Sequence, residues 1–244
     1  MLSSIKTKKL APNQTHIWFI NFSQQLNNLS FFLSILSKEE KEKASKFKFK
    51  KDKNCSIITR GALRLLSGKY LNLNPKDIRF KYGEYGKPYY NMETKLKFNV
   101  SHSGNMAVIG FVLIDDIGVD IEEIKTDFEV FDIASNYFSK LEIETLNELP
   151  KEKHVECFYR CWTRKESFIK AKSQGLSFPL DSFSVSIHSD KHTELLETKW
   201  DEKEKSTWKL FTFTHQQNYI GAVSVQNKIV NIEYFNIIDY KIIP

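Results

Sequence analysis

The sequence contains few cysteines, three among 244 residues. Their odd number, with Cys157 and Cys161 close together on one predicted helix, argues against a disulfide scaffold and favours a reducing compartment. No stretch approaches the roughly 18 uninterrupted apolar residues of a membrane span. The early lysines are not followed by the apolar run of a secretory signal. We therefore expect a soluble, cytoplasmic protein.

Several signatures of cofactor and nucleophile sites are also missing. The sequence has no G-x-G-x-x-G and no P-loop, because GEYGKP lacks the required spacing. It has no G-x-S-x-G of a serine hydrolase. Cys157-x-x-x-Cys161 lacks a second ligand pair for zinc. These four classes of site have no support in the sequence.

The composition, with 41% apolar and 14% aromatic residues, is that of a globular protein. The net charge of +6 favours an anionic partner, and nucleic acid, a phosphorylated cofactor, an acidic protein or a membrane surface all qualify. Between Lys38 and Lys53 stand eight lysines against four acids, without an arginine. This run is typical of a solvated helix face, and nucleic-acid binding is less favoured.

Helical and strand patterns each occur twice along the chain. An apolar strand is predicted at 15–22, and Ser37 with Glu40 forms the capping-box signature of a helix start. Further helices are predicted at 55–71, 128–138, 139–149 and 152–173, and strands at 78–82, 96–102, 106–114, 118–122, 183–188, 207–214, 219–226 and 229–235. We predict an α+β protein of two similar halves, 1–118 and 119–244. No flexible linker divides them, so we expect one compact unit.

The segment GVDIE places two carboxylates on an apolar strand. Alternate residues of a strand share a face, so Asp120 and Glu122 project together. They repel each other unless a cation lies between them, and oxygen ligands favour Mg²⁺ or Mn²⁺. An edge strand with its polar face in water explains the pair equally well.

The helix predicted at 152–173 carries a third acid. Glu166 lies on the apolar stripe of this helix, which is formed by Val155, Phe158, Trp162 and Ile169. Lys170 follows Glu166 by four residues and is its neighbour on the helix surface. Glu166 either completes a metal site with the strand pair or forms a partly buried ion pair with Lys170.

Two predicted turns offer groups for a phosphate. Ser101 and His102 lie in NVSHSGN, and Lys87 lies in YGEYGKPYY. The alternatives are a surface histidine and a solvated turn lysine. The residues alone thus favour a metal-assisted reaction on a phosphorylated substrate. A metal-dependent nuclease or phosphatase, or a basic nucleic-acid-binding protein, remains an alternative.

Five segments together resemble the 4′-phosphopantetheinyl transferases of the surfactin-synthetase-activating (Sfp) type. In chain order they are YGKPYY, FNVSHSGNMAVIGF, GVDIEEI, FYRCWTRKESFIKA and GLSFPLDSFSV. The resemblance covers about residues 37–225. It implies two α+β halves related by a pseudo-twofold axis, an active site between them, and a monomer.

The implied reaction is a magnesium-dependent transfer of the 4′-phosphopantetheine group from coenzyme A to a serine of an apo carrier protein, releasing adenosine 3′,5′-bisphosphate. Peptidyl, acyl and aryl carriers all qualify, as in non-ribosomal peptide and antibiotic biosynthesis. No nucleic acid or membrane partner is implied. The carrier and the tolerance for acyl-coenzyme A stay open.

The resemblance also implies roles for single residues. The Mg²⁺ ligands would be Asp120, Glu122 and Glu166, and the catalytic set would be Glu166, Lys170 and Asp120. Glu166 would take the serine proton directly or through a metal-bound water. Coenzyme A would contact Lys43, Ser56, Lys87, Ser101, His102 and Lys170. Glu40 stands where the family has a basic residue, which leaves the contacts of this helix to the 3′-phosphate open.

The segment KSQGLSFPLDSF offers a surface for the carrier. Leu176, Phe178 and Leu180 lie beside Lys172 and are either a docking surface or part of the core.

Overall fold

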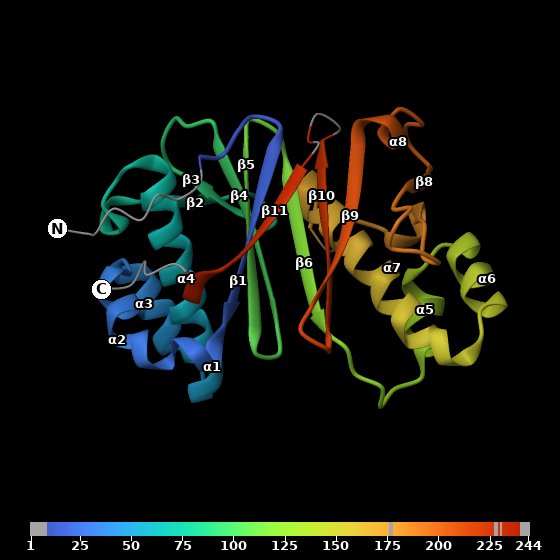
Figure 1. Ribbon diagram of the computed structural model, residues 1–244, viewed down its shortest axis with the longest axis horizontal. Coiled ribbons are helices and arrows are strands. Elements are labelled where there is room, and N and C mark those ends of the chain that lie inside the picture. The colour runs from blue at the N-terminus through green and yellow to red at the C-terminus, as the bar shows by residue number, and fades with distance from the viewer. Residues whose placement is uncertain (1–8, 176–177, 227–228, 230, 240–244) are drawn as a thin grey trace.

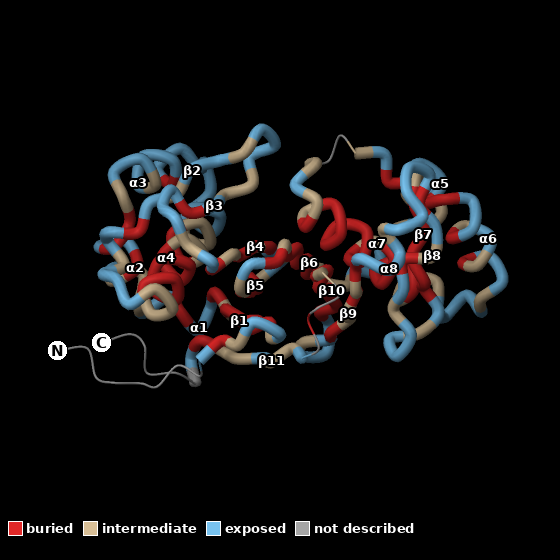
Figure 2. The backbone as a smooth tube through the Cα atoms, turned by 90° about the horizontal axis from the view of Figure 1, so that it is seen from above, coloured by how far each residue is buried: buried red, intermediate tan, exposed pale blue. Residues whose placement is uncertain are grey.

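The structure is a computed structural model, and it describes residues 9–175, 178–226, 229 and 231–239. The two larger of the four sheets lie side by side at the centre, with one group of helices on the outer side of each (Figure 1). Viewed from above, the buried residues concentrate in the sheets and in the helices that face them (Figure 2). The α+β class predicted from the sequence is confirmed.

The first half contains a sheet and four α-helices. Its α-helices are α1 (Phe22–Gln25), α2 (Leu29–Ile35), α3 (Lys38–Ser45) and α4 (Lys50–Leu71). Its strands are β1 (Gln14–Asn21), β2 (Phe80–Tyr82), β3 (Pro88–Tyr90), β4 (Leu96–Ser103) and β5 (Met106–Leu113). Two short 3₁₀ helices, η1 (Leu26–Asn28) and η2 (Pro75–Asp77), connect them.

The second half follows a similar plan. Its α-helices are α5 (Val130–Tyr137), α6 (Lys140–Glu148), α7 (Lys151–Lys172) and α8 (Glu204–Thr207). Its strands are β6 (Ile117–Glu123), β7 (Phe183–Val185), β8 (Leu195–Thr198), β9 (Trp208–His215) and β10 (Tyr219–Gln226). The 3₁₀ helix η3 (Leu180–Ser182) precedes β7, and β11 (Asn231–Asn236) with η4 (Ile237–Asp239) ends the described chain.

The topology of the two halves repeats. Both have a first strand, helices, a 22-residue helix, a short hairpin and a long hairpin. The strand orders β1-β5-β4 and β6-β10-β9 correspond one to one. The 22-residue helices α4 and α7 both end at a left-handed residue, Asn72 and Ser173. The repeated order expected from the sequence is therefore present in the structure.

The halves are joined by an apolar layer between the two sheets. Ile17 and Val108 of the first sheet belong to one buried cluster with Val119 and Val223 of the second. β11 pairs in parallel with β1, so a segment of the predicted second half, 119–244, completes the first sheet. The division at residue 118 stays a prediction.

Local signals explain where several elements begin. The Ser37 side chain accepts from the Glu40 backbone amide and the Glu40 side chain accepts from that of Ser37, which is the predicted capping box of α3. The predicted turn at 99–105 is much shorter, because β4 and β5 stay paired as far as Ser103 and Met106. Gly104, at a φ of +56°, lies in the turn that joins them. Ser101 and His102 therefore lie on a strand.

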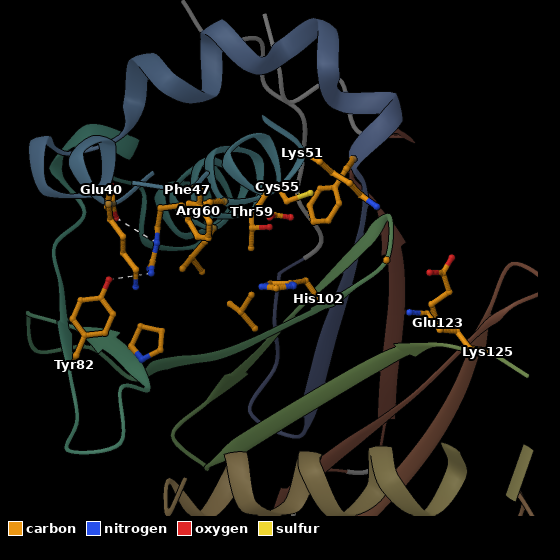
Figure 3. A pocket seen from close by; sticks show the side chains of 18 residues that line it. Glu40, Phe47, Lys51, Cys55, Thr59, Arg60, Tyr82, His102, Glu123 and Lys125 are labelled. Atoms are coloured by element: carbon orange, nitrogen blue, oxygen red, sulfur yellow. Dashed lines mark hydrogen bonds and ion pairs between the residues drawn. The ribbon is translucent and has the colours of Figure 1, made fainter. Parts of the chain in front are cut away.

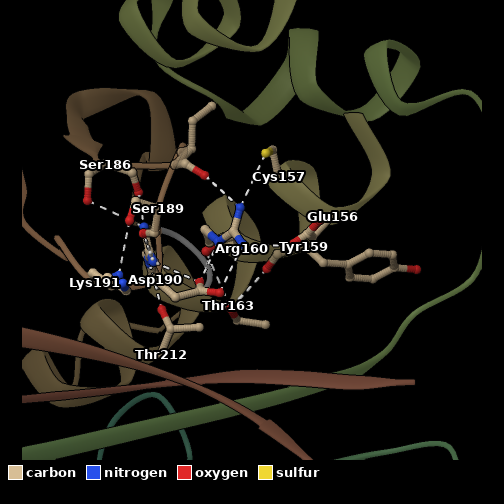
Figure 4. Close-up of polar contacts among 12 residues, drawn as sticks. Glu156, Cys157, Tyr159, Arg160, Thr163, Ser186, Ser189, Asp190, Lys191 and Thr212 are labelled. Carbon is tan, nitrogen blue, oxygen red and sulfur yellow. Dashed lines mark hydrogen bonds and ion pairs between the residues drawn. The ribbon is translucent and has the colours of Figure 1, made fainter. Parts of the chain in front are cut away.

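Buried charged groups hold α7 within the second half (Figure 4). The Arg160 guanidinium donates to Asp190 Oδ1 at 2.5 Å and to the Ile187 carbonyl at 3.1 Å. One turn further, the fully buried Lys165 pairs with Glu142 at 2.8 Å. These paired charges therefore hold α7 to α6 and to the loop that follows β7.

Among the described residues, no helix is both long enough and apolar enough to cross a membrane.

Candidate active site

Side chains of β4 and β6 contact each other at alternate positions. The Ser101 hydroxyl donates to Asp120 Oδ1 at 2.8 Å, and the Ser103 hydroxyl donates to Glu122 Oε2 at 2.6 Å. Asp120 is only 2% exposed. The alternation of the strand thus directs both carboxylates toward β4, as their spacing predicted.

The helix α7 brings a cation to the same place. Lys170 Nζ lies 2.6 Å from Asp120 Oδ1 and 3.0 Å from Ser101 Oγ. Lys170 therefore forms its ion pair with Asp120. The alternative expected from the helix spacing, a pair with Glu166, is not what the structure forms. Ser101, Asp120 and Lys170 make one connected group.

Two carboxylate oxygens beside this group have no hydrogen-bond partner. They are Asp120 Oδ2 and Glu166 Oε1, both buried within the described part of the chain. Burial raises the pKa of Glu166 to about 7; Lys170 opposes this shift, while Asp120 and Glu122 add to it. Burial and then Asp120 raise the pKa of Glu122. Three carboxylates therefore repel one another in a partly dry space, which costs free energy unless a cation joins them.

The donor set is chemically suited to a hard divalent cation. Carboxylate oxygens are the ligands that Mg²⁺ prefers, and two of them here are unpaired. In residues 9–175, 178–226, 229 and 231–239, however, no three acidic, histidine or cysteine side chains are already arranged to hold a metal. The metal role of Asp120, Glu122 and Glu166 therefore remains a prediction.

A cavity of about 580 Å³ lies beside β4 and the end of β6 (Figure 3). His102 and Glu123, the sequence neighbours of Ser101 and Glu122, line it, whereas Asp120, Glu122 and Glu166 do not. Lys43, Ser56 and His102, which the resemblance assigned to coenzyme A, line it. His102 follows Ser101 on β4 and points to the opposite side, so the same strand serves the cavity and the acidic group. Burial and the Lys170 charge lower the pKa of His102.

Other cavity residues were not predicted from the sequence. Lys51, Arg60 and Lys125 add positive charge to its wall, and Thr59 adds a hydroxyl. Arg60 and Thr59 lie three to four residues after Ser56 on α4, and helical spacing could have indicated a shared face. Lys125 is the second residue after β6, and no local pattern distinguishes it.

Arg60 has a donor that the protein leaves unused. Its Nη2 donates to the Tyr82 hydroxyl at 3.0 Å and its Nε lies 3.6 Å from Glu40, whereas Nη1 is buried without a partner. Thr59 Oγ1 is likewise buried and unpartnered in the described structure. Glu40 is held at 2.6 Å by the buried Arg64. Glu40 thus has a structural role as the ion-pair partner of Arg64. Arg60 contributes a positive charge to the cavity wall.

Lys87 is not brought to this cavity. It lines a second cavity of about 530 Å³, and its ammonium donates to backbone carbonyls of β6 and α7. Its predicted contact with coenzyme A has no support in this geometry.

The predicted carrier-docking segment is partly buried. Leu180 is in the core, and the ring of Phe178 packs edge-on against Trp200 at 5.0 Å between centroids. Leu176 lies outside the described residues. For Phe178 and Leu180 the structure favours the core alternative.

Comparisons with known proteins place the chain among enzymes that transfer a phosphopantetheine group. Residues 116–224 match the family model described as the 4′-phosphopantetheinyl transferase superfamily, and residues 21–111 match that of the 4′-phosphopantetheinyl transferase N-terminal region. The transferase Sfp of Bacillus subtilis is 40% identical over 159 residues, 65% of this chain and 70% of that protein. The transferase HetI of a Nostoc species is 29% identical over 219 residues, 88% of this chain and 89% of that protein.

A solved structure, named as a complex of coenzyme A with the ACPS of Chronobacterium ammoniagenes, is also similar. It shares 20% identity, covers 46% of this chain and 96% of its own, and has a TM-score of 0.31.

The sequence matches show the class first: the protein is a transferase. The chain belongs to the 4′-phosphopantetheinyl transferase family, and the predicted Sfp type is confirmed.

Proposed function

We propose that the protein transfers the 4′-phosphopantetheine group of coenzyme A to a serine hydroxyl of an apo carrier protein and releases adenosine 3′,5′-bisphosphate. The observation that carries this proposal is that two features lie close together. The first is a cavity lined by His102 and by four cationic side chains against three acidic ones. The second is the group formed by Ser101, the neighbour of His102 on β4, in which Lys170 contacts Asp120 while buried carboxylate oxygens lack partners. The first feature suits a polyanionic nucleotide, and the second suits a phosphoryl group with its cation.

The cavity residues would bind the nucleotide end of coenzyme A. Lys43, His102 and Arg60 supply positive charge or hydrogen-bond donors, and Ser56 supplies a hydroxyl. A phosphate near His102 would favour the charged imidazole and oppose the lowering of its pKa by burial. Because Glu40 is engaged by Arg64, the unused donor of Arg60 supports a role for this arginine in place of residue 40.

The acids would hold the metal. Asp120, Glu122 and Glu166 fit Mg²⁺ by ligand type, and the ion would neutralise charge on the pyrophosphate oxygens. Lys170 would contact the phosphoryl group from the C-terminal turn of α7. Glu166 would take the serine proton directly or through a metal-bound water, since one of its carboxylate oxygens is buried without a partner beside the acidic group.

Carriers of peptidyl, acyl or aryl type are the proposed partners, with non-ribosomal peptide or antibiotic biosynthesis as the setting. The net charge of +6 supports an acidic partner. We further propose that the protein acts as a monomer in the cytoplasm.

Mass spectrometry of a carrier tests the proposal. Purified protein, coenzyme A and Mg²⁺ are incubated with apo peptidyl, acyl and aryl carriers. At least one carrier should gain the phosphopantetheine mass at its serine, and chelation of the metal should prevent this. No adduct on any carrier would refute the function.

A further inference from the structure

The Lys87 ammonium is bound to the backbone of two other elements. Its Nζ lies 3.1 Å from the Ile117 carbonyl oxygen at the start of β6. It lies 2.6 Å from that of Lys170 and 3.4 Å from that of Ala171, both in the last turn of α7. One side chain from the loop between β2 and β3 thus connects the first half to the helix that carries Glu166 and Lys170.

A cation is stabilising at carbonyl groups in the last turn of a helix. The last four carbonyls of an α-helix lack intrahelical amide partners and carry the negative end of the helix dipole. Ser173 ends α7 in the left-handed region, and its amide is shared between Ile169 and Lys170. Lys87 supplies the donors and the charge that this end lacks.

Neighbouring contacts leave the end of α7 little room. A Cβ on Gly118 would overlap the Ser167 carbonyl oxygen and the Ala171 amide nitrogen, so β6 and α7 are in backbone contact. On the other side, a Cβ on Gly175 would lie 2.7 Å from Cβ of Tyr85, in the loop that carries Lys87. The loop between β2 and β3 therefore packs against the segment that follows α7.

We propose that Lys87 is a positioning residue, which clamps the C-terminal turn of α7 to β6 and thereby holds Lys170 and Glu166 toward Asp120. The expected effect of this clamp on transfer activity rests on the proposed function. It differs from the contact with coenzyme A that the sequence suggested, because the ammonium is already used by three carbonyl oxygens.

A pH effect should accompany this clamp. Burial lowers the pKa of Lys87 to about 8; Asp116 opposes the shift and Lys97 adds to it. The other ionisable groups around it are Lys170, whose ammonium is paired with Asp120, and four side chains of the hairpin, Lys81, Tyr85, Tyr89 and Tyr90. Above this pH the amine loses its charge and holds the helix end less firmly. Lys87→Arg stays charged, so its transfer rate should persist to higher pH than that of the wild type.

The main test compares Lys87→Met with Lys81→Met. Lys81 lines the same second cavity but its ammonium lies over the Tyr89 ring. In Lys87→Met we expect amide exchange of residues 170–175 to accelerate about tenfold and kcat to fall by about tenfold or more, because charged hydrogen bonds are lost. Affinity for adenosine 3′,5′-bisphosphate should change less than about twofold, since the cavity is untouched. Lys81→Met should behave as the wild type.

Several outcomes would overturn the proposal. If amide exchange of residues 170–175 is unchanged in Lys87→Met, Lys87 does not clamp α7. If exchange is unchanged and nucleotide affinity falls tenfold, Lys87 contacts the nucleotide directly. If Lys87→Met does not fold, a pH profile of Lys87→Arg identical to that of the wild type would contradict the claim. If the wild type modifies no carrier, the proposed function fails, while exchange at α7 still decides whether Lys87 holds the helix.

Discussion

Glu166 lies in a buried position that opposes its charge. Glu166 is only 6% exposed, and one of its carboxylate oxygens has no hydrogen-bond partner. Burial raises its pKa from 4.5 to about 7. A folded-state pKa above the unfolded value means that stability is fully present below pH 4.5 and is lost as pH rises through 7. At the residue scale, Glu166 thus costs stability at the pH where it is needed as a base and ligand.

Glu166→Gln should separate these two effects. At pH 8 the metal-free variant should be more stable than the wild type by up to about 3 kcal/mol, because a buried charge is gone. Near pH 4.5 the two should be similar, and transfer should be abolished at any pH. Denaturant unfolding at both pH values measures this, with the exposed Glu144→Gln as control. Lower stability of Glu166→Gln at pH 8 would contradict the assigned burial cost.

Asp120→Ala should abolish transfer as well. Asp120 is the contact that Lys170 and Ser101 share, and it is a proposed metal ligand. Near-UV circular dichroism should show an intact fold, and the carrier assay should show no adduct. Retained transfer would remove Asp120 from the site.

Arg60→Met should weaken binding of coenzyme A. The loss of its unused donor and its charge from the cavity wall should raise KM about tenfold or more, with a smaller effect on kcat. Arg79→Met is a suitable control, because Arg79 does not line the cavity. Equal KM values for the two variants would exclude Arg60 from the nucleotide site.

At the scale of elements, the contact between β6 and α7 sets the position of the acids. Gly118→Ala should force α7 away from β6 and lower the free energy of unfolding by about 1–3 kcal/mol, as overpacking does. Transfer should fall with it, because Lys170 and Asp120 separate. Gly83→Ala, whose added Cβ would meet ordinary contacts from 3.8 Å, should leave stability and rate unchanged. Equal stability of both variants would contradict the close approach.

The elements also show what the sequence could predict. The capping box at Ser37 and the shared face of Asp120 and Glu122 follow from local spacing, and both are present. Lys170 was expected beside Glu166, but it pairs with Asp120 of β6, a contact between distant segments that no helical spacing reveals. The place of Lys87 depends on carbonyl groups from two distant segments, so no motif could encode it.

At the scale of the whole molecule, the two halves should unfold together. The apolar layer between the sheets and the pairing of β11 with β1 couple them. Trp18 is the sole tryptophan before residue 118, whereas Trp162, Trp200 and Trp208 report on the second half. Variants with only Trp18 or only Trp208 should show coincident denaturant midpoints by fluorescence. Separate midpoints would show two independent domains.

The repeated topology explains why a site forms at the centre of this chain. β4 and β6 lie at facing edges of the two sheets, and α7 crosses the second sheet to reach them. The doubled order of helices and strands was readable from the sequence. The crossing of β11 back to the first sheet was not, because its alternation fits either sheet equally.

Binding of Mn²⁺ in the presence of coenzyme A, followed by electron paramagnetic resonance, tests the central claim most directly. The wild type should bind the ion, and Asp120→Ala and Glu166→Gln should each weaken binding at least about tenfold, because each removes a charged ligand. Glu144→Gln should bind as the wild type does. Unchanged Mn²⁺ affinity in both site variants would show that these carboxylates do not form the metal site.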